Sequence, residues 1–215
     1  MAKKRISDVL IDVLANAGIE RIYGITGDSL NSVNDSLRRN GKIAFEHVRH
    51  EETAAFAAGA EASLTGKLTV CAGSSGPGNL HLINGLFDCH RNRVPVLAIA
   101  SHIPQSEVGL NYFQETHPEN LFKECSCFCE LVSNPKQMPE ILFRAMNAAV
   151  GNQDVAVIVL PGDVAVMETE IDELPVWHHP RLPHIVPQRE DIEEMYAHLE
   201  KGERITLFCG AGCEG

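Results

Sequence analysis

Two adjacent carboxylates, Glu51 and Glu52, open a segment of mostly small residues, 53–60. The strand-like run 43–48 comes directly before them. An acid that follows a strand and opens a helix lies where open α/β sheets bind their ligands. The alanine and glycine face of that helix would let another backbone or a flat ligand approach closely. A simpler explanation stays open, because the positive end of a helix dipole favours acids in the first turn.

A second candidate is the glycine-rich turn Gly73–Gly78, which follows the apolar run 68–72. Backbone amides at the start of the next helix can hold a phosphate group. The turn is not a Walker loop, because no Gly-Lys-Ser/Thr follows it. A plain tight turn explains the same glycines equally well.

Other catalytic classes have little support in the sequence. The chain has no G-x-S-x-G elbow, and His50-Glu51-Glu52-Thr53-Ala54 lacks the second histidine of H-E-x-x-H. Seven cysteines without secretory marks argue against a disulfide framework. Cys125, Cys127 and Cys129 would share one face of a strand, which leaves buried thiols or a metal site. The usual C-x-x-C spacing is missing, so we predict no metal site.

Composition narrows the class of protein. The 215-residue chain carries a net charge of −11 and has no long basic run, which argues against a nucleic-acid partner. It has no signal-peptide core and no apolar run near the roughly 18 residues that a membrane span needs. We therefore expect a cytoplasmic location.

Strand-like and helix-like segments alternate between residues 21 and 160. This alternation predicts an α/β fold, a doubly wound, mainly parallel sheet with helices on both faces. A long polar loop over 102–120 interrupts it, and loops of this length are often functional. We predict strands at 21–25, 43–48, 68–72, 94–100, 127–132 and 155–160, and helices at 4–17, from about 30 to 40, at 51–64, through 82–87, at 119–124 and at 135–150.

The same pattern suggests three regions: a first domain over 1–165, a linker over 166–188 and the start of a second α/β domain over 189–215. The linker is rich in proline and histidine and has no periodicity. A helix at about 189–200 and a strand at 204–209 should begin the second domain. Gly210, Gly212 and Gly215 then satisfy G-x-G-x-x-G, which is half of a dinucleotide fingerprint. We expect the chain to be part of a longer protein.

Three strand ends deliver the polar segments 26–29, 50–52 and 73–81. Because the carboxyl ends of parallel strands lie along one edge of a sheet, these loops should converge on one crevice. The convergence favours a ligand site at Glu51 over two acids that only balance a dipole.

Longer motifs resemble one enzyme family. Arg49-His50-Glu51 with its alanine-rich helix, and Gly76-Pro77-Gly78-Asn79-Leu80-His81, resemble the pyrimidine-binding N-terminal domain of thiamine-diphosphate enzymes of the pyruvate oxidase and acetolactate synthase superfamily. The likeness extends from about residue 6 to the end. It is greatest to the quinone-dependent pyruvate oxidase type, which the segments 26–31, 81–92 and 112–118 fit.

The resemblance implies roles for individual residues. Glu51 would be the catalytic residue, bonded to N1′ of the aminopyrimidine ring, where proton sharing helps the ring amine remove the thiazolium C2 proton. Glu52 would be structural or interfacial. The resemblance also implies that Pro77, Gly78 and His81 line the pyrimidine side of the site and that Thr26 and Gly27 close it. Ser74 would also bind the cofactor. Phe113 and Gln114 would lie on the substrate side.

For the longer protein, the resemblance implies oxidative decarboxylation of pyruvate with thiamine diphosphate, Mg²⁺ and FAD. Electrons would pass to a quinone or oxygen. Neither Gly27-Asp28-Ser29 nor Gly162-Asp163-Val164 has the third glycine of the family's Gly-Asp-Gly motif, which holds Mg²⁺ and the diphosphate. Mg²⁺ and FAD would therefore bind mostly through parts outside this chain.

The family also implies a homo-oligomer, a dimer or tetramer, with active sites at subunit interfaces, and leaves room for peripheral membrane contact. Two alternatives remain: an acetolactate-synthase-like carboligase and a non-catalytic binding module. We expect the 215-residue chain alone to be inactive.

Overall fold

Six parallel strands form the central sheet in the computed structural model, which describes residues 2–171, 173–181, 186–210 and 213. The strand order is β3-β2-β4-β5-β7-β6. All five pairings in this sheet are parallel. The strands are β2 (Arg21–Gly24), β3 (Ala44–His47), β4 (Thr69–Gly73), β5 (Val96–His102), β6 (Phe128–Leu131) and β7 (Val155–Pro161).

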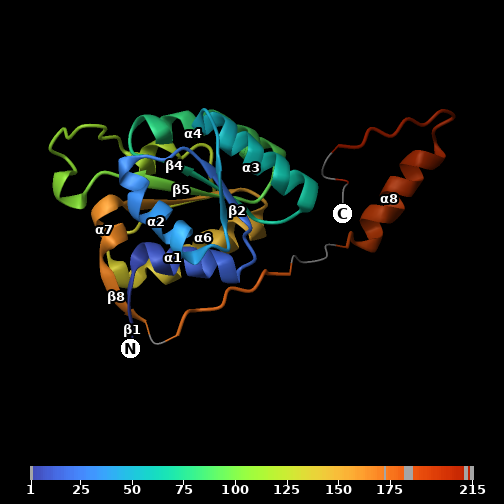
Figure 1. The fold of residues 1–215 in the computed structure, drawn as a ribbon. Coiled ribbons are helices and arrows are strands. Elements are labelled where there is room, and N and C mark those ends of the chain that lie inside the picture. Colours follow the sequence, from blue (N-terminus) through green and yellow to red (C-terminus); the bar gives the residue numbers. More distant parts are fainter. Residues whose placement is uncertain (1, 172, 182–185, 211–212, 214–215) are drawn as a thin grey trace. The chain divides into compact units, whose positions relative to one another are not determined.

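Helices cover both faces of this sheet (Figure 1). On one face pack α1 (Ile6–Asn16), α2 (Asn31–Asn40), α6 (Met138–Asn152) and α7 (Gly162–Val166). On the other face pack α3 (Glu51–Thr65) and α4 (Pro77–Asn92). The remaining short helices are α5 (Pro118–Leu121) and the 3-10 turns Asp28–Leu30, Gln105–Glu107 and Pro135–Gln137.

Strand β5 shows why the sheet needs two helical layers. Leu97 and Ile99 belong to the core cluster that includes α1 and α6, whereas Val96, Ala98 and Ala100 belong to the cluster that includes α3 and α4. Alternate residues of a strand point to opposite faces, so an apolar run must be covered on both sides. The predicted fold class is confirmed.

Glycines end two helices at the predicted places. Gly41 (φ +67°) follows α2 and Gly66 (φ +66°) follows α3, and each backbone N–H donates to a carbonyl one turn back. Left-handed backbone at this position suits glycine, which has no Cβ to clash.

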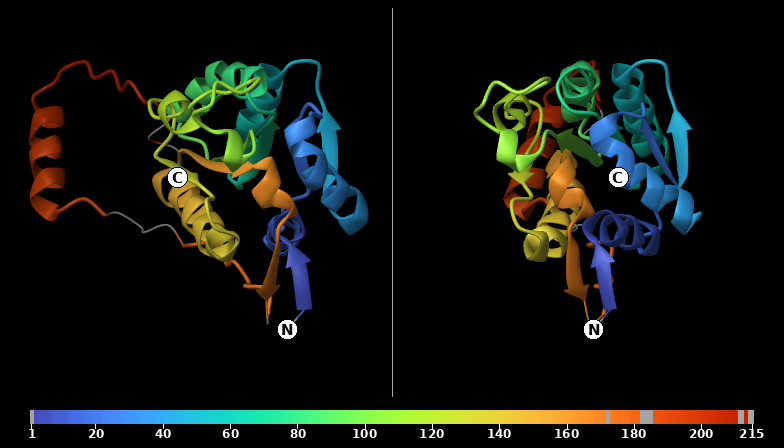
Figure 2. Two further views of the ribbon diagram at one scale, coloured as in Figure 1. Left: turned by 90° about the vertical axis from the view of Figure 1, so that its left-hand side faces the viewer. Right: turned by 60° about the vertical axis from the view of Figure 1, so that its left-hand side comes forward.

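One pair of strands was not predicted. β1 (Ala2–Arg5) pairs antiparallel with β8 (Glu168–Ile171), and the two lie side by side in both views of Figure 2. Trp177 is buried in the larger core cluster, and its indole N–H donates to Asn147 Oδ1 at 2.9 Å. Residues 168–171 and Trp177 therefore hold ordered contacts within the range 166–188, for which the sequence suggests a linker.

The chain divides into two units, Met1–Pro180 and Arg181–Gly215. In the second unit, α8 (Arg189–Glu200) agrees with the predicted helix. The strand predicted over 204–209 is wrong, because these residues have no regular structure and no partner strand among the described residues. Gly210 is described, whereas Gly212 and Gly215 of the predicted dinucleotide fingerprint lie outside the described residues.

Within the described part of the chain, every helix is too short or too polar to cross a membrane.

Candidate functional site

The chain reverses its direction across the sheet between β2 and β4. From β2 it passes outward to β3, and then returns past β2 to form β4 and the rest of the sheet. Ligands of open α/β sheets bind outside the carboxyl ends of the strands at such a switch point. The segments that follow β2, β3 and β4 lie at this edge of the sheet, as the sequence predicts.

Glu51 is the first residue of α3 and is only 8% exposed. The fully buried Ala54, Ala55 and Ala58 follow it on the helix and pack in the core. Oε2 of Glu51 lies 3.0 Å from Nδ1 of His81, which comes from α4. The carboxylate is thus held between two helices at the edge of a water-poor core.

Gly78 lies against the other oxygen of this carboxylate. A Cβ at Gly78 would lie 3.2 Å from Oε1 of Glu51 and 3.3 Å from Cβ of Ser74. Gly78 therefore packs closely against the buried carboxylate, and a side chain at this position would crowd it. Gly27 likewise has no room for a side chain, because a Cβ would clash with Ser74 Oγ. Ser74, Gly78 and Glu51 therefore share one small space.

Glu52 turns away from this space. Its carboxylate accepts a hydrogen bond from Asn84 Nδ2, and its backbone N–H donates to His50 Nδ1 at 3.3 Å. His50 thereby caps the start of α3 with its ring. Two acids that are neighbours in the sequence consequently have different surroundings.

His50 also stacks on His81, with 4.3 Å between ring centroids and 25° between the planes. Ligand atoms of His50, Glu51 and His81 all lie within 4.8 Å of one another, the one such trio in the described part of the chain. A metal needs nitrogen lone pairs that converge, and these lie in the ring planes. Because the two rings are stacked, their lone pairs point in parallel directions rather than toward one metal ion. We therefore interpret the stack as a contact that holds the Glu51–His81 pair in place.

The long loop contributes Gln114 and Phe113. Ser75 Oγ donates to Gln114 Oε1 at 3.3 Å, and a Cβ at Gly76 would lie 2.8 Å from the Gln114 carbonyl oxygen. Gln114 itself has a positive φ of 63°, which is uncommon for a residue with a side chain. Phe113 is 77% exposed and borders a cavity with Gln114. The loop thus closes on the β4–α4 turn.

Thr26 is the predicted residue that the structure does not bring to Glu51. It is exposed and borders a separate open hollow beside α2, together with Leu37 and Phe45. Its neighbour Gly27 does contact the β4–α4 turn, through Ser74.

Three residues near the site were given no individual role from the sequence: His50, Ser29 and His102. His50 and Ser29 lie within the predicted segments 50–52 and 26–29, whereas His102 was missed. Ser29 Oγ accepts from the Ser75 backbone N–H at 2.9 Å and lies 2.9 Å from Ser74 Oγ. His102 is the last residue of β5 and borders the same cavity as Gln114. The rule applied to β2, β3 and β4, that strand ends carry site residues, would also have found His102.

The three clustered cysteines do not share a face, contrary to the prediction. Cys125 is buried, Cys127 is exposed and Cys129 is half-buried, and only Cys129 lies within β6. Burial raises the pKa of the Cys125 thiol to about 11 and that of Cys129 to about 12. These are protonated thiols that pack as small apolar groups.

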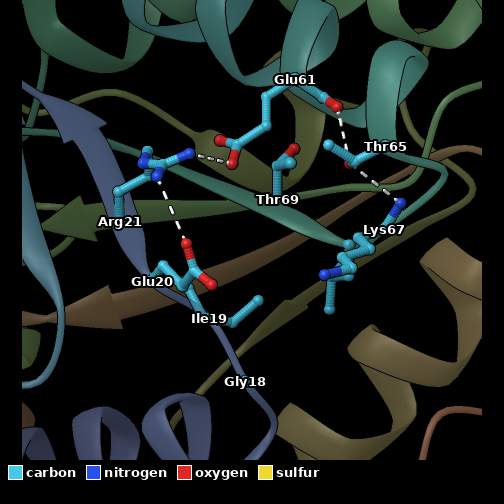
Figure 3. Close-up of a pocket in the computed structure, with 9 residues that line it drawn as sticks. Gly18, Ile19, Glu20, Arg21, Glu61, Thr65, Lys67 and Thr69 are labelled. Atoms are coloured by element: carbon cyan, nitrogen blue, oxygen red, sulfur yellow. Dashed lines mark hydrogen bonds and ion pairs between the residues drawn. The ribbon is translucent and has the colours of Figure 1, made fainter.

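A second pocket lies at the opposite, amino edge of the sheet, where β2 and β4 begin (Figure 3). Three of its charged groups pair with one another, because Arg21 contacts both Glu61 and Glu20. Thr65 Oγ1 donates to the Glu61 carbonyl oxygen at 2.7 Å. Because these groups are already paired, the pocket offers a ligand less than the carboxyl edge does.

Comparisons with known proteins give one matching family and several individual relatives. A family model described as thiamine pyrophosphate enzyme, N-terminal TPP binding domain, matches residues 4–121. That range includes Glu51, the β4–α4 turn and the long loop.

Individual relatives match over most of this chain. An uncharacterized 42.6 kDa protein of Pseudomonas amyloderamosa is 57% identical over 100% of this chain and 54% of its own length. A pyruvate oxidase of Lactiplantibacillus plantarum is 33% identical over 94% of this chain and 34% of its own. An acetolactate synthase of Arthrospira platensis is 35% identical over 81% and 31%. The chain thus spans about half of the first relative and about a third of the other two.

Proposed function

This chain belongs to the thiamine pyrophosphate enzymes and carries their N-terminal TPP-binding domain, and from this we propose that it supplies the cofactor-activating half of a pyruvate-decarboxylating oxidoreductase. The observation that carries the proposal is the buried Glu51 carboxylate, with one oxygen on His81 and the other beside Gly78. The intact protein would use thiamine diphosphate, Mg²⁺ and FAD and pass electrons to a quinone or oxygen.

The residues present fit the pyrimidine half of thiamine diphosphate. A flat ring can approach a carboxylate only where no side chain intervenes, and Gly78 has none beside Glu51 Oε1. A ring nitrogen needs a carboxyl oxygen as its partner, and Oε1 is the oxygen that does not face His81. Ser74, Pro77 and His81 would border the ring, with Gly27 behind Ser74.

When bound, thiamine diphosphate would supply the carbon nucleophile that attacks a 2-oxo acid and takes up the electrons left by decarboxylation. Glu51 would hold the proton shared between its Oε1 and the pyrimidine ring. His81 would keep the Glu51 carboxylate in position from α4, and the stacked His50 would keep His81 in position. The buried alanines of α3 would exclude water from the shared proton.

The choice between oxidase and carboligase rests on two sequence segments. The pyruvate oxidase and the acetolactate synthase among the relatives are 33% and 35% identical, so identity favours neither. The segments 112–115 and 88–91 resemble the oxidase type, and we therefore propose oxidation. A carboligase is the second candidate, because the acetolactate synthase is as similar to this chain. We propose that Mg²⁺ and FAD bind mostly through parts of the intact protein outside the described residues.

The proposal is tested with the intact protein that contains this chain. With thiamine diphosphate, Mg²⁺ and FAD, it should reduce a quinone or dye in a pyruvate-dependent reaction. Glu51→Gln should lower kcat by about 10²–10⁴-fold, the usual contribution of a positioned proton-transfer group. Glu52→Gln is the matched control and should change kcat by no more than a few-fold, because the Glu52 carboxylate contacts Asn84 rather than His81 or Gly78.

Each alternative has its own outcome. Acetolactate formation without dye reduction would replace the oxidase by the carboligase. Equal losses in the two variants would show that the wrong carboxylate was chosen. Thiamine diphosphate binding without turnover of pyruvate would favour a binding module.

A further inference from the structure

A cavity of about 240 Å³ lies at the carboxyl edge of the sheet, beneath the long loop. The residues that border it come from the segments after β2, β4 and β7, from the end of β5 and from the long loop. The residues that border it are Asp28, Ser29, Ser75, His102, Ile103, Pro104, Tyr112, Phe113, Gln114 and Gly162. Gln114 borders this cavity and also accepts a hydrogen bond from Ser75 in the β4–α4 turn. The same turn leads into Gly78, which lies against Glu51.

His102 is the group in this wall that stands out. Its side chain is almost wholly enclosed, with 4% exposed, and its Nδ1 is buried without a hydrogen-bond partner among the described residues. Burial lowers the pKa of the imidazole, against the opposing effect of Glu119 and Glu115 on the loop. His102 is therefore neutral at pH 7, with one nitrogen that donates and one that accepts.

The other polar groups of the wall are already occupied with one another. Ser29 Oγ accepts from the Ser75 N–H, and Ser75 Oγ donates to Gln114 Oε1. Ser101 Oγ, next to His102 in the chain, donates to the Ser29 carbonyl oxygen at 2.6 Å. These bonds fix the wall. They leave His102 with an unpaired buried nitrogen, whose cost falls when a ligand or water completes it.

We propose that His102 hydrogen-bonds an oxygen atom of the 2-oxo acid that enters this cavity and thereby helps to select that substrate. The proposal rests on the proposed function and adds a substrate-binding residue to it. The apolar neighbours Ile103 and Phe113 suit the short methyl end of a pyruvate-sized acid.

The charges around the cavity bind the carboxylate of an oxo acid only weakly. Asp28 is the charged residue that borders the cavity, and no lysine or arginine does so among the described residues. A neutral imidazole orients an oxo acid without the strong stabilisation that a cation gives to a carboxylate. Because decarboxylation must lose that carboxylate, binding it weakly in the ground state favours the reaction.

The first test compares kinetics in the intact holoenzyme. His102→Leu replaces the imidazole by an apolar side chain of similar size. This variant should raise KM for pyruvate about tenfold, the effect of one lost hydrogen bond, and should change kcat less. His102→Asn retains a polar group near the Nδ1 position and should stay within a few-fold of wild type. His198→Leu, which replaces an exposed histidine of α8, is the matched control and should leave KM unchanged. Thiamine diphosphate affinity should be the same in all variants.

The second test does not depend on turnover or on variant folding. Oxamate, a pyruvate-sized acid that cannot be decarboxylated in this reaction, is added to the ¹⁵N-histidine-labelled wild-type holoenzyme. The ring-nitrogen resonances of His102, assigned with the Asn variant, should shift on titration, and those of His198 should not.

The outcomes separate the two proposals. Wild-type protein that does not turn over pyruvate would refute the proposed function. Turnover with a normal KM in His102→Leu, or His102 resonances that oxamate leaves unchanged, would refute the role of His102 alone.

Discussion

Gly85 of α4 lies directly against the backbone of α3, and replacing it tests how these two helices hold the site together. A Cβ at Gly85 would lie 2.6 Å from Ala55 Cβ, 2.8 Å from the Glu52 carbonyl oxygen and 3.0 Å from the Phe56 nitrogen. Two of these three neighbours are backbone atoms, which cannot rotate away. In Gly85→Ala, α4 must therefore move away from α3.

The size of the effect follows from two opposing contributions. Alanine gains up to about 1 kcal/mol over glycine in a helix interior. Overpacking a tight contact costs about 1–3 kcal/mol, and immovable backbone neighbours place this site at the upper end. We therefore expect Gly85→Ala to lower the free energy of unfolding by about 1–2 kcal/mol. Because His81 lies one turn earlier on α4, the same movement should lengthen its 3.0 Å contact with Glu51.

Urea unfolding followed by circular dichroism measures this change as a lower midpoint at an unchanged m-value. Gly151→Ala is the matched control, since Gly151 lies in α6 and no atom would approach its Cβ within 4 Å. That variant should be more stable than wild type by about 0.5–1 kcal/mol. Gly85→Ala with wild-type stability, or the same loss in both variants, would refute the argument that the α3–α4 contact requires glycine.

Three further predictions concern the loop and the buried thiols. Gly76→Ala should lower stability by about 1–3 kcal/mol and speed proteolysis of the loop, since φ is +66° and a Cβ would meet the Gln114 carbonyl oxygen at 2.8 Å; unchanged cleavage would contradict it. The backbone N–H groups of Gly109 and then Tyr112 lower the pKa of the Glu115 carboxyl below its usual 4.5. The stabilisation that the Glu115 carboxylate gives is therefore full above pH 4.5 and disappears as the pH falls through the lower pKa of the folded state. The urea midpoints of wild type and Glu115→Gln should converge at acid pH, and a constant difference between them would contradict this prediction. Burial raises the pKa of the Cys89 thiol to about 12, so a thiol reagent at pH 8 should label it only after denaturation, as mass spectrometry of native and unfolded protein would reveal.

Much of the fold could be predicted from local patterns. The apolar run of β5 requires cover on both faces, and Gly41 and Gly66 end their helices where the sequence places them. The strand predicted over 204–209 failed, because an apolar run becomes a strand only when another strand supplies hydrogen bonds. The β1–β8 pair was missed for the converse reason, since its partners are more than 160 residues apart and neither alone has a strong strand pattern.

For the site, the sequence by itself determined the residue types and their order: a carboxylate after β3, a glycine-rich turn after β4 and a long polar loop after β5. These are local properties, and parallel strands bring such segments to one edge in any case. Only the tertiary structure decided the partners. It placed His81 on one oxygen of Glu51 and Gly78 beside the other, turned Glu52 toward Asn84, and left His102 Nδ1 buried with no partner in the described part of the chain. Hydrogen bonds form over about 3 Å between residues far apart in the chain, so their pairing depends on how the helices pack, which spacing along the sequence does not specify.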